Sequence, residues 1–241
     1  MTAPAEIVEG DAGSGLLLIA DHASNYVPDD IALGIDPALL NEHIAVDIGI
    51  EPLARQVAAR LGCPAILATI SRLVVDLHRR ADEAAAIPVA SDGHEIPGNA
   101  ALGEQARKDR IGRFWEPYHA LIAAEVEARR PKMLFTLHSF TPQLRTRPEE
   151  ARPWHVGILY NQDERAALLG IGAFRARGIP TGDNEPYSGK ILNATMDLHA
   201  ESRGLPYLAI EVRQDLISDP AGVAHWAGVI APVLAEVRDA L

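Results

Sequence analysis

Three ionisable side chains stand in or directly after apolar runs that lie far apart in the chain. The run LLLIADH ends at His22, MLFTLHS contains His138, and LAIEVR contains Glu211. A lone histidine at a strand end is commonly only a hydrogen-bonded residue at a sheet rim. Three such endings favour a functional role, because an apolar strand gains nothing from burying a charge at its end. Two neutral imidazoles and a carboxylate with one open position form a catalytic zinc environment, and a further carboxylate can act as general base.

The ligating carboxylate can come from the segment 41–51, which we expect to be helical. His43, Asp47 and Glu51 are spaced i, i+4 and i+8, so they would lie on one stripe of that helix. A solvated face with ion pairs is the simpler interpretation for His43 and Glu51. Asp47 lies between apolar neighbours in VDIGI and is the better candidate to point inward.

The stretch SRLVVDLHRR alternates in a way that predicts a strand over 72–77. Arg72 and Asp76 would then share one face. They either pair with each other or line a pocket in which the Arg72 guanidinium binds a substrate carboxylate through two parallel hydrogen bonds.

Gly182 and Gly189 bracket the stretch GDNEPYSG. This stretch is either a loop that closes over a site, with the glycines as hinges, or a long ordered connection. Glu185 and Tyr187 are its candidates for substrate contact.

The elements that would position these residues are apolar runs alternating with segments of helical period. This pattern is typical of an α/β fold with a mostly parallel or mixed central sheet covered by helices on both faces, in which ligands bind outside the carboxyl ends of the strands. The expected strands are 16–20, 65–71, 72–77, 133–140, 155–161 and 205–216. The expected helices are 37–61 (kinked at Pro52), 101–129 (bent at Pro117), 163–177 and a C-terminal helix from 219 onward. Residues 81–100, 141–153 and 179–190 are predicted loops, and 1–241 is expected to form one domain.

Composition limits the partners. The chain of 241 residues has a formal net charge of −11, so nucleic acid and anionic membranes are poor partners, whereas a small anion can bind where arginines gather. The single cysteine, Cys63, allows neither an internal disulfide nor a multi-cysteine zinc site. The chain has no uninterrupted apolar stretch of about 18 residues, so its sequence predicts no membrane span. The acidic N-terminus lacks the features of a secretory signal, which favours the cytoplasm. The oligomeric state stays open.

Six pieces of the chain together resemble the N-formylglutamate amidohydrolase family. They are DHASNYVP, HIAVDIG, SRLVVDLHR, TLHSF, GDNEPYSG and GLPYLAIEVRQDL, and their order and spacing match from near residue 15 to near residue 217. The resemblance implies a zinc carboxypeptidase-like fold and a metal-dependent amidohydrolase with one Zn²⁺ per chain. Its substrate would be a small anionic N-acyl amino acid such as N-formylglutamate, split into formate and glutamate in histidine degradation.

The resemblance also implies a ligand set. His22 and His138 become metal ligands, and Asp47 falls where the family has an acidic residue in its first helix. The related carboxypeptidases bind zinc through H-x-x-E, whereas this chain has Asn25, a poor zinc ligand, three residues after His22. The carboxylate ligand is therefore Asp47 or, as second choice, Glu51.

The remaining roles follow in the same way. Glu211 falls at the general base of the fold, and Arg72 and Arg79 fall on the basic substrate-binding positions. The expected substrate-binding set is completed by Asp76, Glu185, Tyr187 and Arg213. His78 stands where better-studied family members carry an asparagine, which marks this chain as a divergent branch.

Other functions stay open from the sequence alone. A zinc hydrolase of the same fold could act on a different N-acyl amino acid or on a peptidoglycan-type amide. A metal-free module could use Arg72 and Arg79 to bind a small anion. His199, which precedes the last strand, could also approach the site.

Overall fold

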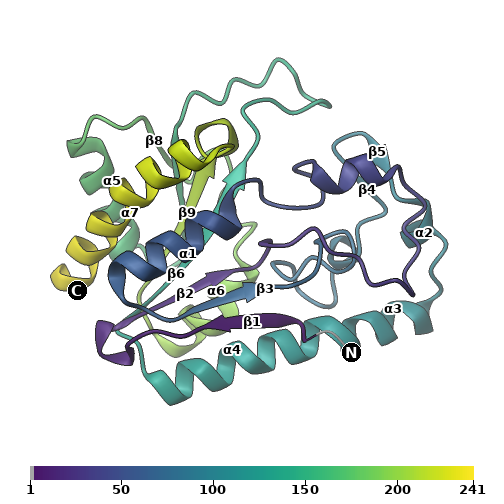
Figure 1. Cartoon of the computed structure of the whole chain (residues 1–241), viewed down its shortest axis with the longest axis horizontal. Coiled ribbons are helices and arrows are strands. Elements are labelled where there is room, and N and C mark those ends of the chain that lie inside the picture. The colour runs from purple at the N-terminus through teal and green to yellow at the C-terminus, as the bar shows by residue number, and fades with distance from the viewer. Residues whose placement is uncertain (1–2) are drawn as a thin grey trace.

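The computed structural model describes residues 3–241. Its centre is a seven-stranded sheet in the order β1-β3-β2-β6-β9-β7-β8 (Figure 1). These strands are β1 (Ala5–Val8), β2 (Leu16–Ala20), β3 (Ala65–Ala68), β6 (Met133–Phe140), β7 (Val156–Leu159), β8 (Thr181–Asp183) and β9 (Tyr207–Arg213). Strands β3, β2, β6 and β9 run parallel, whereas β1 and β7 run antiparallel to β3 and β9, and β8 is parallel to β7. The predicted α/β fold with a mixed sheet is confirmed.

Helices cover both faces of the sheet. They are α1 (Ile50–Leu61), α2 (Pro97–Ala100), α3 (Glu104–Arg110), α4 (Glu116–Arg129), α5 (Arg165–Ala176), α6 (Ala194–His199) and α7 (Pro220–Ala240). Leu16 and Leu18 of β2 face the layer of α1, α5 and α7, whereas Leu17 and Ile19 face α4 and α6. Because both faces of β2 are covered, the strand reads as an unbroken apolar run.

Helix α7 is long and apolar enough to cross a membrane by length and composition alone. Its residues Val223, Trp226, Ile230 and Leu234 belong to the core that α7 shares with α1, α5 and the sheet. The helix is therefore accounted for as a core helix of this fold.

The expected helix over 37–61 is wrong in its first half. The structure has a 3-10 turn at Pro37–Asn41 and no regular helix from 42 until α1 begins at Ile50. Gly49 precedes α1 in the left-handed conformation (φ 80°), and a Cβ there would lie 2.2 Å from the carbonyl oxygen of Ile217. Pro52 falls in the first turn of α1, where its missing N–H leaves no bond unmade, so it causes no kink.

The expected strand over 72–77 is also wrong, because this segment folds into turns. Polar groups bond the backbone locally: the Leu73 N–H donates to Ser71 Oγ (3.2 Å), and the His78 N–H donates to Asp76 Oδ1 (3.0 Å). Such local bonds compete with a sheet ladder, and they leave Arg72 and Asp76 close to each other.

The predicted loops contain short elements that sequence patterns do not reveal. A hairpin of β4 (Ala90–Ser91) and β5 (His94–Glu95) and helix α2 lie within 81–100, and β8 lies within 179–190. The long helical segment 101–129 forms α3, a π-helical turn at Ile111–Trp115 and α4. The π turn lies directly before Pro117, which lacks an N–H to donate.

Two buried histidines outside the cavity described below make the stability depend on pH. His119 Nδ1 lies 2.8 Å from His199 Nε2, and His119 Nε2 lies 2.9 Å from the carbonyl oxygen of Leu77. Burial lowers the pKa of His119 to about 4 and that of His199 to about 3. The unfolded chain takes up protons from pH 6.5 downward while the folded chain does not, so the free energy of unfolding falls as the pH drops from about 6.5 to about 4.

We expect the double variant His119→Gln/His199→Gln to have a shallower pH dependence of stability than the wild-type protein. The difference should be on the order of 2 kcal/mol for each histidine between pH 7 and pH 5. Urea unfolding at several pH values measures it. The exposed His225, changed to glutamine, is the matched control; a double variant as pH-dependent as that control would contradict the assignment.

Candidate functional site

A cavity of about 240 Å³ opens beyond the carboxyl ends of the central parallel strands. His22 follows β2, and His138 and Glu211 are direct neighbours across the β6–β9 ladder. All three line the cavity, together with Asp47, Arg72, His78, Arg79 and Tyr187. The structure thus brings together the three strand-end side chains with which the sequence analysis began.

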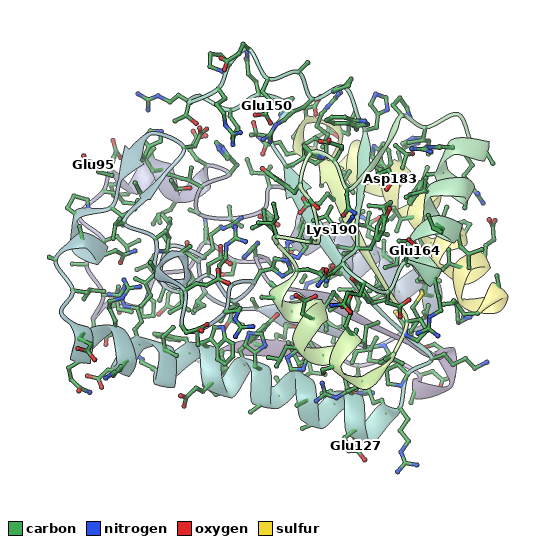
Figure 2. The ribbon with its side chains drawn as sticks, turned by 180° about the vertical axis from the view of Figure 1, so that it is seen from behind. Glu95, Glu127, Glu150, Glu164, Asp183 and Lys190 are labelled. Atoms are coloured by element: carbon green, nitrogen blue, oxygen red, sulfur yellow. The ribbon has the colours of Figure 1, made fainter. Side chains whose placement is uncertain are left out.

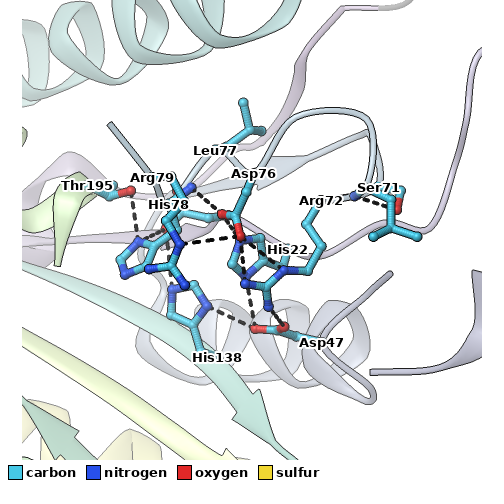
Figure 3. Close-up of polar contacts among 12 residues, drawn as sticks. His22, Asp47, Ser71, Arg72, Asp76, Leu77, His78, Arg79, His138 and Thr195 are labelled. Atoms are coloured by element: carbon cyan, nitrogen blue, oxygen red, sulfur yellow. Dashed lines mark hydrogen bonds and ion pairs between the residues drawn. The ribbon is translucent and has the colours of Figure 1, made fainter. Parts of the chain in front are cut away.

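His22, Asp47 and His138 form a compact cluster in the cavity wall (Figure 3). Asp47 Oδ2 lies 2.9 Å from His138 Nδ1 and 3.4 Å from His22 Nδ1. Asp47 lies in the segment before α1 and is held in place there, because the Asp47 N–H donates to the carbonyl oxygen of His22 (3.1 Å). Three possible ligand atoms, two nitrogens and one oxygen, lie within 4.8 Å of one another.

The outer nitrogens of both rings face further carboxylates. His22 Nε2 lies 2.7 Å from Asp76 Oδ1. His138 Nε2 lies 3.3 Å from Asp21 Oδ2, close but without hydrogen-bonding geometry. Metal-ligating histidines commonly present their second nitrogen to a carboxylate in this way, which leaves both Nδ1 atoms for a metal.

A second possible cluster consists of Asp21, His78 and His138. Asp21 is already engaged, since the Tyr118 hydroxyl donates to Oδ1 (2.8 Å) and His78 Nδ1 lies 3.0 Å from Oδ2. Asp21 is also absent from the cavity wall, as the described residues form it. The first cluster therefore suits a metal that must be reached by a substrate.

The charges of the cluster favour a cation. Although burial raises the pKa of Asp47, His22 and His138 hold it well below the ordinary value. Burial opposes protonation of His138, yet Asp21 and Asp47 keep its pKa well above the ordinary value. Without a metal, protons on the imidazoles balance the carboxylates, and a bound divalent cation would take over that role.

Glu211 has a carboxyl group suited to proton transfer. Burial, with a smaller contribution from the charge of Asp47, raises its pKa to about 7. Its Oε2 atom is buried and has no hydrogen-bond partner among the residues that the structure describes. An unpaired buried carboxylate oxygen costs free energy unless a substrate, water or ion completes it.

Arg72 and Arg79 have different surroundings. Arg72 donates to Asp76 Oδ2 (2.7 Å) and to Asp47 Oδ1 (3.3 Å), so its charge fixes two carboxylates of the site. The nearest acidic atom to Arg79 is Asp76 Oδ2 at 3.9 Å, and within 3–241 no group accepts a hydrogen bond from its guanidinium. Arg79 is therefore more available to a ligand than Arg72 is.

The other predicted residues divide into two groups. Tyr187 lines the cavity, and its hydroxyl accepts a hydrogen bond from Arg152 (3.0 Å). Asp76 lies behind His22 and Arg72, not in the cavity wall.

The second group lies away from the cavity. Glu185 is exposed, and Arg213 donates to Asp215 (2.8 Å). Glu51 forms an ion pair with Arg55, because α1 starts too late to put it on one stripe with Asp47. His199 is stacked on His119, outside the cavity wall that the described residues form.

Sequence reasoning did not place His78 and Asp21 in the site. His78 lines the cavity with its Nδ1 atom 3.0 Å from both Asp21 Oδ2 and Thr195 Oγ1. The departure from asparagine at this position was the available signal for His78. For Asp21, the signal was a second charge at the end of β2.

Comparisons with known proteins identify the family and support the fold. The family model of the N-formylglutamate amidohydrolases matches residues 14–218. Among solved structures, a gene product of Agrobacterium tumefaciens shares 29% identity and a TM-score of 0.91, over 99% of this chain and 96% of its own. The N-formylglutamate amidohydrolase from Ralstonia eutropha shares 20% identity and a TM-score of 0.74, over 99% of this chain and 98% of its own, and so shows the same fold. No curated protein matches the sequence. Because the family model spans most of its length, the chain belongs to the N-formylglutamate amidohydrolase family.

Proposed function

We propose that the protein hydrolyses the amide bond of a small N-acyl acidic amino acid such as N-formylglutamate, with one Zn²⁺ held by His22, Asp47 and His138. The observation that supports this most directly is the cluster of two imidazoles and the Asp47 carboxylate in a cavity that Glu211, whose Oε2 atom has no partner among the described residues, also lines. Two imidazoles and a carboxylate form the donor set of catalytic zinc sites. A cavity of about 240 Å³ suits a substrate of this small size.

When bound, zinc would supply Lewis acidity, which makes water acidic enough to attack near neutral pH and polarises the substrate carbonyl. Glu211 accepts a proton from the attacking water as the water oxygen bonds to the carbonyl carbon of the substrate. Glu211 then delivers that proton to the nitrogen as the C–N bond breaks, which releases formate and the free amino acid. Burial of Glu211, which raises the pKa of its carboxyl group in the metal-free protein, makes this group easier to protonate than an exposed carboxylate and so supports its proposed role in both steps.

Arg79 binds the α-carboxylate next to the scissile amide through its guanidinium, whose ion pair with Asp76 is long at 3.9 Å. Arg72 fixes Asp47 and Asp76 and so keeps His22 oriented. Tyr187 contacts the substrate from the cavity wall. A local cation is needed, because the chain as a whole has a net charge of −11 and repels anions.

The proposed function is tested by incubating the zinc-loaded protein with N-formyl-L-glutamate and measuring formate and glutamate. A chelator should abolish the release of both, and added Zn²⁺ should restore it. A protein that holds stoichiometric zinc but cleaves no N-acyl amino acid would contradict the proposal. A protein that binds small anions without any metal would instead favour the binding module. The cytoplasm stays the predicted location.

The role of Arg79 gives a separate prediction. Arg79→Gln should raise KM for N-formylglutamate by about 10- to 100-fold, because a charge-assisted hydrogen bond to a carboxylate is lost. Steady-state kinetics measure this change. Arg213→Gln is the matched control, since Arg213 pairs with Asp215 outside the cavity wall, and its KM should stay at the wild-type value. An equal rise in both variants would refute the assignment of Arg79.

A further inference from the structure

Two segments predicted as plain loops meet at the mouth of the cavity. One is the β4–β5 hairpin, and the other is the loop 141–153. In Figure 2, Glu95 of the hairpin and Glu150 of the loop lie on the same upper side of the molecule.

Asp92, in the turn of the hairpin, joins the two segments. Its carboxylate accepts hydrogen bonds from the N–H of Arg145 (2.9 Å), the N–H of Thr146 (3.0 Å) and the Thr146 hydroxyl (2.8 Å). Its Oδ2 atom also lies 3.1 Å from His43 Nε2.

The environment of Asp92 shows that surrounding contacts hold this junction in a defined conformation. The side chain is only 5% exposed, and its backbone has a positive φ of 39°. Burial raises the pKa of the carboxyl, but the hydrogen bonds from the two backbone N–H groups and the Thr146 hydroxyl, together with the charge of His43, outweigh burial and lower the pKa to about 2. A non-glycine residue with positive φ costs free energy and persists only where surrounding contacts enforce it.

The junction brings Thr146 and Arg147 to the cavity, which both line. Arg147 lies at the mouth, where its side chain is 61% exposed and, among the described residues, forms an ion pair only with Glu150 (2.9 Å). Arg145, two residues earlier in the same loop, turns instead to His94 (2.9 Å) and lies outside the cavity wall.

Three arginines thus line the cavity, and Arg72 is already committed to two carboxylates of the site. Arg79 and Arg147 remain for a ligand. If the α-carboxylate of the substrate binds Arg79 next to the scissile amide, a second carboxylate on the amino-acid side chain extends toward the mouth.

We propose that Arg147 binds the side-chain carboxylate of a dicarboxylic N-acyl amino acid and so determines specificity, and that Asp92 is the positioning residue that holds Arg147 over the cavity. This inference rests on the proposed function and deepens it. Arg147 exchanges Glu150 for the substrate carboxylate, so no buried charge is left unpaired.

The experiment compares kcat/KM for N-formyl-L-glutamate and N-formyl-L-glutamine, which differ by one carboxylate. In Arg147→Gln, the preference for the glutamate derivative should fall about 10-fold, chiefly through KM, because one charge-assisted hydrogen bond is lost. Asp92→Ala should lower the same preference while leaving the zinc content unchanged, since Asp92 holds the loop through hydrogen bonds only. Arg145→Gln is the matched control and should keep the wild-type preference.

An unchanged preference in Arg147→Gln, or an equal fall in Arg145→Gln, overturns the role of Arg147 while the proposed hydrolase activity stands. If the wild-type protein cleaves neither substrate, the proposed function fails and the inference fails with it. The two failures are therefore distinguishable.

Discussion

Glu211→Gln should lower kcat by about 10²–10⁴-fold, the range typical for loss of a general acid–base group. Glutamine preserves the size of the side chain but can neither accept the proton of the attacking water nor deliver it to the leaving nitrogen. The Oε2 atom that would carry this proton is buried and has no hydrogen-bond partner among the described residues.

The measurement is formate release at saturating substrate, together with the zinc content of the same preparation. Zinc should stay bound, because Glu211 lies outside the cluster of His22, Asp47 and His138. Glu185→Gln is the matched control, since Glu185 is exposed and lies outside the cavity wall. A Glu211→Gln protein with bound zinc and near-normal turnover would remove the general base from the mechanism.

Asp47→Asn should weaken zinc binding by more than about 100-fold, because even loss of a residue behind a metal ligand typically costs 10- to 100-fold. The substitution removes the only carboxylate of the ligand cluster and leaves Arg72 with one of its two acidic partners. Metal analysis after dialysis against a weak chelator measures the loss, and turnover should disappear with the metal.

The control is a substitution of Glu51, which was the second choice for the carboxylate ligand in the sequence analysis. Glu51→Gln should keep both zinc and activity, because Glu51 pairs with Arg55 at the surface of α1. Thermal unfolding of the two variants separates loss of metal from loss of fold. Stoichiometric zinc in Asp47→Asn, or its loss in Glu51→Gln, would transfer the ligand role away from Asp47.

The long strands were predictable because burial on both faces leaves a mark on the sequence. β2 is an unbroken apolar run and β6 is a largely apolar one, and both are buried along their whole length. The short edge strands β1 and β8 were not predictable, because β1 (AEIV) includes a charged residue among its four and β8 (TGD) has no apolar run. β1 is defined by its pairing with β3, some 60 residues away, and no local pattern encodes that partner.

The residues of the candidate site also divide into those that were predictable from the sequence and those that were not. His22, His138 and Glu211 were found because strand ends in an α/β sheet converge, a rule that holds whatever the intervening chain does. Asp47 was predicted to face inward because its neighbours are apolar, and it is buried in the cavity wall, although the expected helical stripe does not form and α1 begins three residues later. His78 could not be placed, because its position depends on the turns over 72–77, whose apolar residues imitate a strand.

Because His138 pairs with Glu211 on adjacent strands, the register of the β6–β9 ladder sets the relative positions of the proposed metal ligand and the proposed general base. A slip of β9 by a single rung would rotate the glutamate to the opposite side of the sheet, away from the imidazole. Under the proposed mechanism, loss of this register would remove the general base from the cavity, so turnover should be lost and not merely reduced. On heating, turnover should therefore persist until the ladder between these two strands opens, and then vanish together with it.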